Sequence, residues 1–319
     1  MKTIISDIAT YLPSKIVTND DLSKILDTSH EWIYTRTGIE KRRVSAENEL
    51  ASDLGIAASK KILEQTNLNP LDIDAIIVST TTADRRFPSC ACRIQGAIGA
   101  SRAFAFDLNA ACAGFIYCLA VADSIMKSMN LKNILLVAAE TLTKFVDWTD
   151  RSTCVLFGDG AGAALLKASN DESKGIIATK LYCDGEEEKY NSILSHSGSQ
   201  NGNRGYTTMA GRAVFKYAIE DMTLSINEIL AENNMTINNV DWIIPHQANR
   251  RILESMCKLK GFPIGKVIIT TRDHANTSSA SIPLALKEKM DEGQVKQGDT
   301  LLFTALGAGL VWGSAIVKL

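Results

Sequence analysis

The chain has 319 residues, of which 45% are hydrophobic, and a formal net charge of -2 with a pI near 6.1. This length and apolar content predict a large folded core and exceed one typical domain of about 100–200 residues. The near-neutral charge gives no general attraction for nucleic acid, so an acidic partner would need a local basic patch.

Cysteine usage and hydropathy predict a cytoplasmic protein without a membrane span. The seven cysteines are scattered, odd in number and mostly in apolar surroundings, which is typical of a reducing compartment. Cys90 and Cys92 have no answering pair at zinc-ligand spacing, so we expect no metal site. The N-terminus lacks the apolar core of a signal peptide, and the long uncharged run 300–317 is interrupted by glycines, which favours strand, glycine turn and strand.

Apolar runs and helical spacings predict alternating strands and helices through the first half. Trp32 and Arg36 are four residues apart and share a helix face, which alone indicates only a surface stacking pair but could also hold an adenine ring and a phosphate. The expected strands are 4–9, 74–80 and 134–138, and the expected helical segments are 19–26, 31–38, 52–65 and one ending near residue 97.

The stretch 104–126 begins as an alternating strand and ends with a helical face formed by Phe115, Leu119, Ala122 and Met126. Cys112 lies between these two parts, among alanines and a glycine that let a substrate approach closely. A buried structural cysteine is the usual fate of such a thiol. A thiol at a helix start also feels the helix dipole, so we expect a lowered pKa and a larger thiolate fraction.

The middle of the chain is rich in glycine. Segment 153–168 contains Gly158-Asp-Gly-Ala-Gly followed by an apolar run, which predicts a hairpin turn and not a dinucleotide loop. Segment 169–210 is polar, and we expect it to be a linker or an excursion from the fold. Beyond it we expect helices over 215–229 and 249–259, strands at 241–245 and 267–271, and a helix opening at 273–279.

The two halves of the chain resemble each other. Asp74-Ala-Ile-Ile-Val and Asp241-Trp-Ile-Ile-Pro each begin a strand, and about thirty residues later each half passes from a strand to a small-residue helix. We therefore predict an α/β fold built from residues 1–168 and 169–319, duplicated as a layered αβαβα body with two mixed sheets.

The duplication would bring three chemical groups together. Cys112 and Asn276 take related places at facing helix starts, and His246 closes the strand before, so all three can reach one pocket. Cysteine supplies a nucleophile, and a neutral histidine with an asparagine supplies two hydrogen-bond donors to a developing oxyanion. A lone histidine after a buried strand is more often a core residue whose hydrogen bonds are all made. Here, however, we expect a cysteine and an asparagine beside it.

Taken together, these residues resemble the β-ketoacyl-acyl carrier protein synthase III family, the initiating condensing enzymes of bacterial fatty acid synthesis. The match runs essentially from end to end through long ordered motifs. They are Glu31-Trp-Ile-Tyr-Thr-Arg-Thr-Gly-Ile, Phe87-Pro-Ser, Ala110-Ala-Cys-Ala-Gly-Phe, Asp147-Trp-Thr-Asp-Arg-Ser-Thr-Cys-Val-Leu-Phe-Gly-Asp-Gly-Ala-Gly, Met209-Ala-Gly, Pro245-His-Gln-Ala-Asn and Trp312-Gly-Ser.

The resemblance implies the thiolase fold, a homodimer and a reaction in two stages. Cys112 would take an acyl group from acyl-coenzyme A, and malonyl-acyl carrier protein would then lose carbon dioxide and attack the acyl thioester. His246 and Asn276 match the pair that polarises the malonyl carbonyl, and the backbone N–H groups of Cys112 and Ala308 match the acyl oxyanion hole. No metal or redox cofactor is implied.

The remaining site residues are also implied by this resemblance. Phe87 matches a residue that closes the acyl pocket of the partner subunit, and Leu306 would lie near the His–Asn pair. Arg251 and Lys258, seven apart on one helix face, would dock the carrier protein together with Lys216 and Arg212. The residues expected at coenzyme A are Thr28, Trp32, Arg36, Arg151 and Asn249.

The chain departs from the family pattern at several positions. It has His274-Ala-Asn-Thr-Ser where glycine often follows the histidine, and Leu306-Gly-Ala-Gly-Leu where Phe-Gly-Gly-Gly-Phe is common. Arg212 replaces a smaller polar residue. The acyl primer therefore stays open, as do two alternatives of the same fold: a secondary-metabolism condensing paralogue, or a cysteine-dependent acyltransferase or thioesterase.

Overall fold

A mixed five-stranded sheet forms the core of the first half. The computed structural model describes residues 1–194 and 205–319. The strand order of this sheet is β1-β7-β6-β4-β5, in which β4 is parallel to both β5 and β6 and the other pairs are antiparallel. The bounds are β1 Lys2–Tyr11, β4 Ala75–Ser79, β5 Phe104–Leu108, β6 Asn133–Thr141 and β7 Asp159–Ser169.

A four-stranded sheet of order β11-β12-β13-β8 forms the core of the second half. Here β11 is parallel to β12, and the other neighbours are antiparallel. The bounds are β8 Gly175–Cys183, β11 Trp242–Pro245, β12 Thr300–Gly307 and β13 Val311–Lys318. The predicted strand, turn and strand of 300–317 is therefore confirmed.

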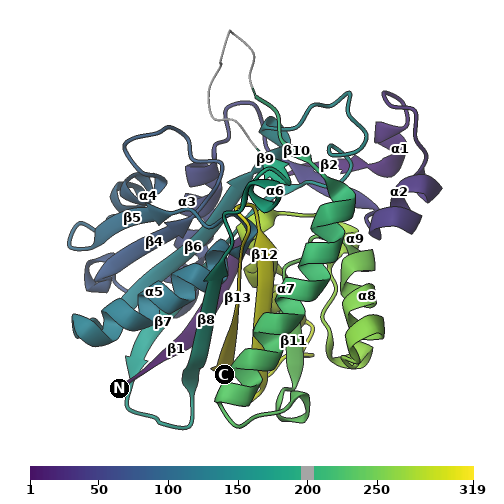
Figure 1. Cartoon of the computed structure of the whole chain (residues 1–319). Coiled ribbons are helices and arrows are strands. Elements are labelled where there is room, and N and C mark those ends of the chain that lie inside the picture. Colours follow the sequence, from purple (N-terminus) through teal and green to yellow (C-terminus); the bar gives the residue numbers. More distant parts are fainter. Residues whose placement is uncertain (195–204) are drawn as a thin grey trace.

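The two sheets are separated by a central helical layer and flanked by outer helices (Figure 1). Helices α5 (Gly114–Ser128) and α10 (Ser281–Asp291) contact strands of both sheets. The outer layers are α3 (Ala51–Thr66) with α4 (Cys90–Ile98) on the first sheet and α7 (Gly211–Glu232) with α8 (Arg250–Lys260) beside the second. The predicted layered α/β fold is confirmed.

The predicted face of α5 is the part that enters the central core. Phe115, Leu119, Ala122 and Met126 are all fully buried there, and Phe115 meets Phe303 of β12 edge to face. Among the described residues, the segment Ala111–Ser128 is the one helix long and apolar enough to cross a membrane by length and composition. Its buried face accounts for that composition, because each fully buried large side chain contributes roughly 1.5–3 kcal/mol to folding.

The internal repeat is visible in the strand orders. The strands β8-β13-β12-β11 and β1-β7-β6-β4 follow the same order of pairings, which is antiparallel, antiparallel and then parallel. The fifth strand of the second half, expected at 267–271, is wrong as a full strand, because only a single bridge joins Ile243 to Val267. A short helix, α9 (Thr271–His274), begins where that strand would continue.

Two expectations for the middle of the chain are wrong. The glycines of 158–162 do not form a hairpin turn, because Asp159–Ser169 is one continuous strand, β7. Gly162 faces α10 so closely that a Cβ would lie 2.6 Å from Pro283 Cβ, so the glycines serve helix packing. Segment 169–210 is not simply a linker, since it supplies β8; its residues 195–204 lie outside the described part of the chain.

The remaining elements are short helices, strands and 3₁₀ turns. Asn249 caps α8 with its side chain, and Gly38 ends α2 in a left-handed conformation. The predicted helix 19–26 is shorter than expected. The bounds are α1 Asn19–Leu22, α2 His30–Thr37, α6 Glu187–Tyr190, β2 Lys15–Thr18, β3 Lys41–Val44, β9 Ile193–Leu194 and β10 Thr208–Met209, with 3₁₀ turns η1 Pro70–Asp72, η2 Ala111–Ala113, η3 Leu142–Lys144, η4 Ile237–Asn239, η5 Ile264–Lys266 and η6 Ser278–Ala280.

Candidate active site

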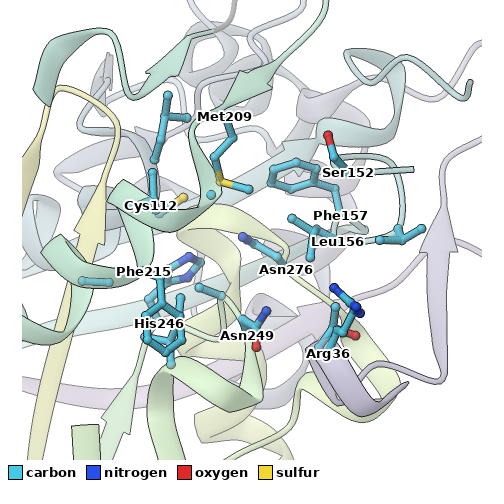
Figure 2. A pocket seen from close by; sticks show the side chains of 18 of the residues that line it. Arg36, Cys112, Ser152, Leu156, Phe157, Met209, Phe215, His246, Asn249 and Asn276 are labelled. Carbon is cyan, nitrogen blue, oxygen red and sulfur yellow. The ribbon is translucent and has the colours of Figure 1, made fainter. Parts of the chain in front are cut away.

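A cavity of about 250 Å³ is lined by Cys112, His246 and Asn276. These three come from η2, from the residue after β11 and from the segment between α9 and η6. Figure 2 shows their side chains gathered on one side of the cavity, with Arg36 on the other side. The sequence prediction that the three residues reach one pocket agrees with this geometry.

Cys112 lies in the middle of a tight turn and not in the first turn of an α-helix. The 3₁₀ turn η2 precedes α5, and Ala111 next to the thiol has a φ of 45°, a left-handed conformation that alanine rarely adopts. On the other side, a Cβ on Gly307 would lie 2.7 Å from the backbone nitrogen of Cys112. The turn is therefore held in a strained shape against the end of β12.

The expected low pKa of Cys112 is wrong for this structure. Burial raises the pKa of its thiol to about 12, while the Ser278 side chain lowers it and the charge of Glu140 raises it. The favourable effect expected of the helix dipole is outweighed by burial, which is the largest influence on the pKa of this thiol. The resting thiol is thus protonated at neutral pH.

His246 is buried at the end of β11 and stays neutral. Burial lowers the pKa of its ring to about 3. Its Nδ1 lies 2.7 Å from Ser281 Oγ, which also accepts the Gln247 backbone N–H at 3.2 Å. Because the Ser281 hydroxyl has no other acceptor among the described contacts, it donates to Nδ1 and leaves Nε2–H as the donor of the ring.

The amide of Asn276 is oriented by its own turn. Its Oδ1 accepts the Ser278 backbone N–H at 2.8 Å, so the Nδ2 group is free to donate into the cavity. Ala275 and Ser278 on either side have φ values of 58° and 51°. Strained conformations of this kind persist where the surrounding structure holds a functional group in place.

The end of β12 adds backbone donors beside the thiol. Ala308 lines the cavity, and Gly307 before it packs on the Cys112 backbone. The N–H groups of Cys112 and Ala308 stay a predicted oxyanion hole, and their close approach depends on the missing side chain of Gly307.

The other end of the cavity carries the aromatic and cationic residues. Trp32, Arg36, Arg151 and Asn249 all line it. The guanidinium carbon of Arg36 lies 4.5 Å from the centre of the Trp32 ring, and that of Arg151 lies 5.0 Å from it. Arg151 is also paired with Asp27, at 3.4 Å between Nη1 and Oδ2.

Comparison with known proteins decides the family. A family model described as 3-Oxoacyl-[acyl-carrier-protein (ACP)] synthase III matches residues 106–185, and its C-terminal counterpart matches 230–319. The chain is 48% identical over 319 residues to the β-ketoacyl-[acyl-carrier-protein] synthase III of Wolbachia pipientis wMel, covering 99% of both chains. The chain belongs to the β-ketoacyl-[acyl-carrier-protein] synthase III family.

Solved structures agree with this membership in the synthase III family. The 3-oxoacyl-[acyl-carrier-protein] synthase III of Aquifex aeolicus VF5 has a TM-score of 0.93 and 44% identity, covering 99% of this chain and 100% of that one. The priming β-ketosynthase of the R1128 polyketide pathway also has a TM-score of 0.93, at 34% identity, covering 99% and 96%.

Two residues assigned from the synthase III resemblance do not line the cavity. Thr28 lies before α2, and its Oγ1 is buried without a hydrogen-bond partner among the described residues. Phe87 is 83% exposed on the loop before α4. Their proposed roles at coenzyme A and at the partner's pocket stay predictions.

The wall of the cavity is apolar, and sequence reasoning assigned only part of it. Leu306 lines it as predicted, and Phe215 and Met222 do so from α7, a helix read from the sequence only as amphipathic. Their helical spacing predicted burial, but spacing does not tell a core from a cavity. The other apolar lining residues are Val155, Leu156, Phe157, Ile193, Met209, Val214, Ala218, Ala248 and Ile252.

The predicted docking cations lie on the surface of α7 and α8. Lys216 is exposed on α7, and Arg251 and Lys258 are exposed on α8. Arg212 is exposed one residue after the cavity-lining Gly211. The described residues contain no group of three or more His, Cys, Asp or Glu side chains placed for a metal ion.

Proposed function

We propose that this protein joins an acyl-coenzyme A primer to malonyl-acyl carrier protein, giving 3-oxoacyl-acyl carrier protein at the start of fatty acid synthesis. The observation that carries the proposal is a single cavity with Cys112, His246 and Asn276 at one end and Trp32 between two guanidinium groups at the other. A thioester with an adenine nucleotide tail has the chemistry to fit both ends.

The first half-reaction is a thioester exchange on Cys112. The sulfur attacks the acyl carbonyl, the C–S bond to coenzyme A breaks, and the thiol proton leaves with coenzyme A as its free thiol. Negative charge develops on the acyl oxygen, and we assign the Cys112 and Ala308 N–H groups as its hydrogen-bond donors. Because burial raises the pKa of the resting thiol, we expect ionisation of Cys112 to accompany substrate binding.

The second half-reaction uses the His–Asn pair. Loss of carbon dioxide from the malonyl group leaves an enolate whose oxygen accepts hydrogen bonds from His246 Nε2–H and Asn276 Nδ2. The enolate carbon attacks acyl-Cys112, and the released sulfur is reprotonated. A buried neutral imidazole suits this role, because it donates without first losing a proton.

A homodimer would complete the acyl pocket. Strand β5 is the last strand of its sheet, and Phe104 and Phe106 stack on it with ring centres 6.5 Å apart while Phe104 is 39% exposed. A second copy pairing along this edge would cover these rings. Phe87, which is exposed on the loop before α4, would then reach the partner's pocket. Leu306 of one protomer and Phe87 of the second copy would together set the size of the acyl primer.

Coenzyme A takes part as the thiol that carries the acyl substrate and is then released. The proposed reaction uses neither a metal nor a redox cofactor, and it involves no nucleic acid or membrane partner. We place the reaction in the cytoplasm, where the seven cysteines, all free in this structure, would stay reduced. The 34% identity to a polyketide priming synthase, against 48% to a fatty acid enzyme, gives the secondary-metabolism alternative less support.

Product and carbon dioxide analysis tests the proposal. Wild-type protein given acetyl- or branched acyl-coenzyme A with radiolabelled malonyl-acyl carrier protein is expected to release labelled carbon dioxide and form the 3-oxoacyl thioester in equal amounts. A thioesterase or plain acyltransferase would release free acid or exchange acyl groups without carbon dioxide, and either result would exclude the condensing reaction.

Trp32→Ala is expected to raise the KM for acyl-coenzyme A by about tenfold to a hundredfold, since stacking one base on an aromatic ring contributes roughly 1–3 kcal/mol. A short pantetheine thioester, which lacks adenine, should react nearly as before, and Trp32→Phe should restore most of the affinity. Steady-state kinetics with both donors measures this. Equal losses for the two donors would place the adenine elsewhere.

Arg251→Glu is expected to slow the reaction with malonyl-acyl carrier protein by about tenfold at low ionic strength, with the defect shrinking as salt is added. The cause is lost attraction between an acidic carrier and the cations of α7 and α8. Malonyl-coenzyme A should react almost normally, and Lys60→Glu on the exposed face of α3 is the matched charge control. An equal loss with both malonyl donors would indicate misfolding or another docking face.

A further inference from the structure

Glu140, the eighth residue of β6, is a fully buried carboxyl group that the reaction above does not use. Its Oε2 accepts hydrogen bonds from Thr81 N at 3.1 Å, Thr81 Oγ1 at 2.9 Å and Thr82 Oγ1 at 2.8 Å. Its Oε1 accepts from Ser279 Oγ at 2.8 Å. Burial raises the pKa of this carboxyl group, the hydrogen bonds oppose that rise, and no salt bridge joins it to another described residue.

These contacts join the two halves directly behind the reacting groups. Thr81 and Thr82 follow β4 of the first half, whereas Ser279 belongs to η6 of the second half, three residues after Asn276. Turn η6 packs against η2, which carries Cys112. The space is tight, because a Cβ on Gly114 would lie 1.9 Å from Ser79 Oγ and 3.5 Å from Ser279 Cβ.

We propose that Glu140 is a positioning residue for the decarboxylation step: its hydrogen bond to Ser279 fixes the turn that carries Asn276, and so the amide that meets the developing enolate. The proposal rests on the role of Asn276 in the proposed function. It is supported by the hydrogen bonds that converge on this one carboxyl group from both halves of the chain.

Glu140→Gln is the conservative variant. The amide oxygen can take the place of Oε2, and the amide N–H can donate to Ser279 Oγ, whose own hydrogen can turn to the Ser79 carbonyl at 3.3 Å. The link to η6 is thus kept, so carbon dioxide release from malonyl-acyl carrier protein should stay near the wild-type rate. Glu140→Asp shortens the reach to Ser279 and should lower release by about tenfold.

Ser279→Ala breaks the same link from the other side, so carbon dioxide release should fall by about tenfold. Alkylation of Cys112 by iodoacetamide at pH 7.5, read by mass spectrometry without any substrate, should stay within about twofold of wild type. Ser279→Thr, which keeps a hydroxyl, should restore release. Glu64→Gln on the surface of α3 serves as the control for a lost carboxylate far from the site.

Normal carbon dioxide release in Ser279→Ala would overturn the positioning role. Slowed alkylation of Cys112 in that variant would also overturn it, because the whole site would then be disturbed. If the Glu140 variants do not fold, the Ser279 pair still decides the result. Absence of carbon dioxide release in the wild-type protein would instead refute the proposed function, and alkylation needs no thioester, so its result stands in either case.

Discussion

Cys112→Ser is expected to abolish acyl transfer, with the rate of acyl-enzyme formation falling on the order of a thousandfold or more at neutral pH. A hydroxyl is a far weaker nucleophile than a thiol in the same place, and nothing in the cavity is arranged to remove its proton: His246 presents an N–H to the cavity because its Nδ1 is bonded to Ser281. The measurement is single-turnover acylation by acyl-coenzyme A, read by intact mass spectrometry.

The matched control is Cys92→Ser, which changes an exposed cysteine on α4 and should acylate at the wild-type rate. Peptide mapping of the wild-type acyl-enzyme should place the label on Cys112. A label on buried Cys118, which lies on α5, would refute the assignment, as would normal acylation in Cys112→Ser.

The fold could be read largely from the sequence, because its strands and helices carry strong patterns. The helical spacing of the buried face of α5 predicted the layers, and the matching segments that begin at Asp74 and Asp241 predicted the duplication. Neither prediction needed side-chain geometry. The errors came where pattern and packing conflict. The glycine-rich run 158–162 resembles a turn in sequence. In the structure, Gly160 and Gly162 lie within β7, where Leu284 and Pro283 leave little room for a side chain.

The site was predicted in outline but not in its electrostatics. Residue type and place in the repeat were sufficient to bring Cys112, His246 and Asn276 together, since related helix starts meet at the pseudo-dyad. The pKa of Cys112 was not predictable in this way, because it is set mainly by burial, which only the three-dimensional structure reveals. Glu140 itself ends an apolar strand and carries no sequence signal of its role.

Asn276→Ala is expected to separate the two half-reactions. Acyl-Cys112 should still form from acyl-coenzyme A, because the charge of that step develops at the backbone donors near β12. Carbon dioxide release from malonyl-acyl carrier protein should fall by about 10²–10³, the usual loss when one oxyanion donor is removed. Single-turnover acylation measured beside radiolabelled carbon dioxide release gives both rates on one sample.

His246→Ala should show the same pattern, because its Nε2–H and the Asn276 amide face the same developing oxygen. Burial keeps the ring pKa at about 3, far below its usual 6.5, so the donor form persists as pH falls through 6.5 and decarboxylation should show no loss there from this residue. The depressed pKa also means that ring protonation destabilises the fold only as pH drops from 6.5 toward 3. If Asn276→Ala blocks acylation and spares carbon dioxide release, the two oxyanion sites have been assigned in reverse, and the amide serves the acyl carbonyl.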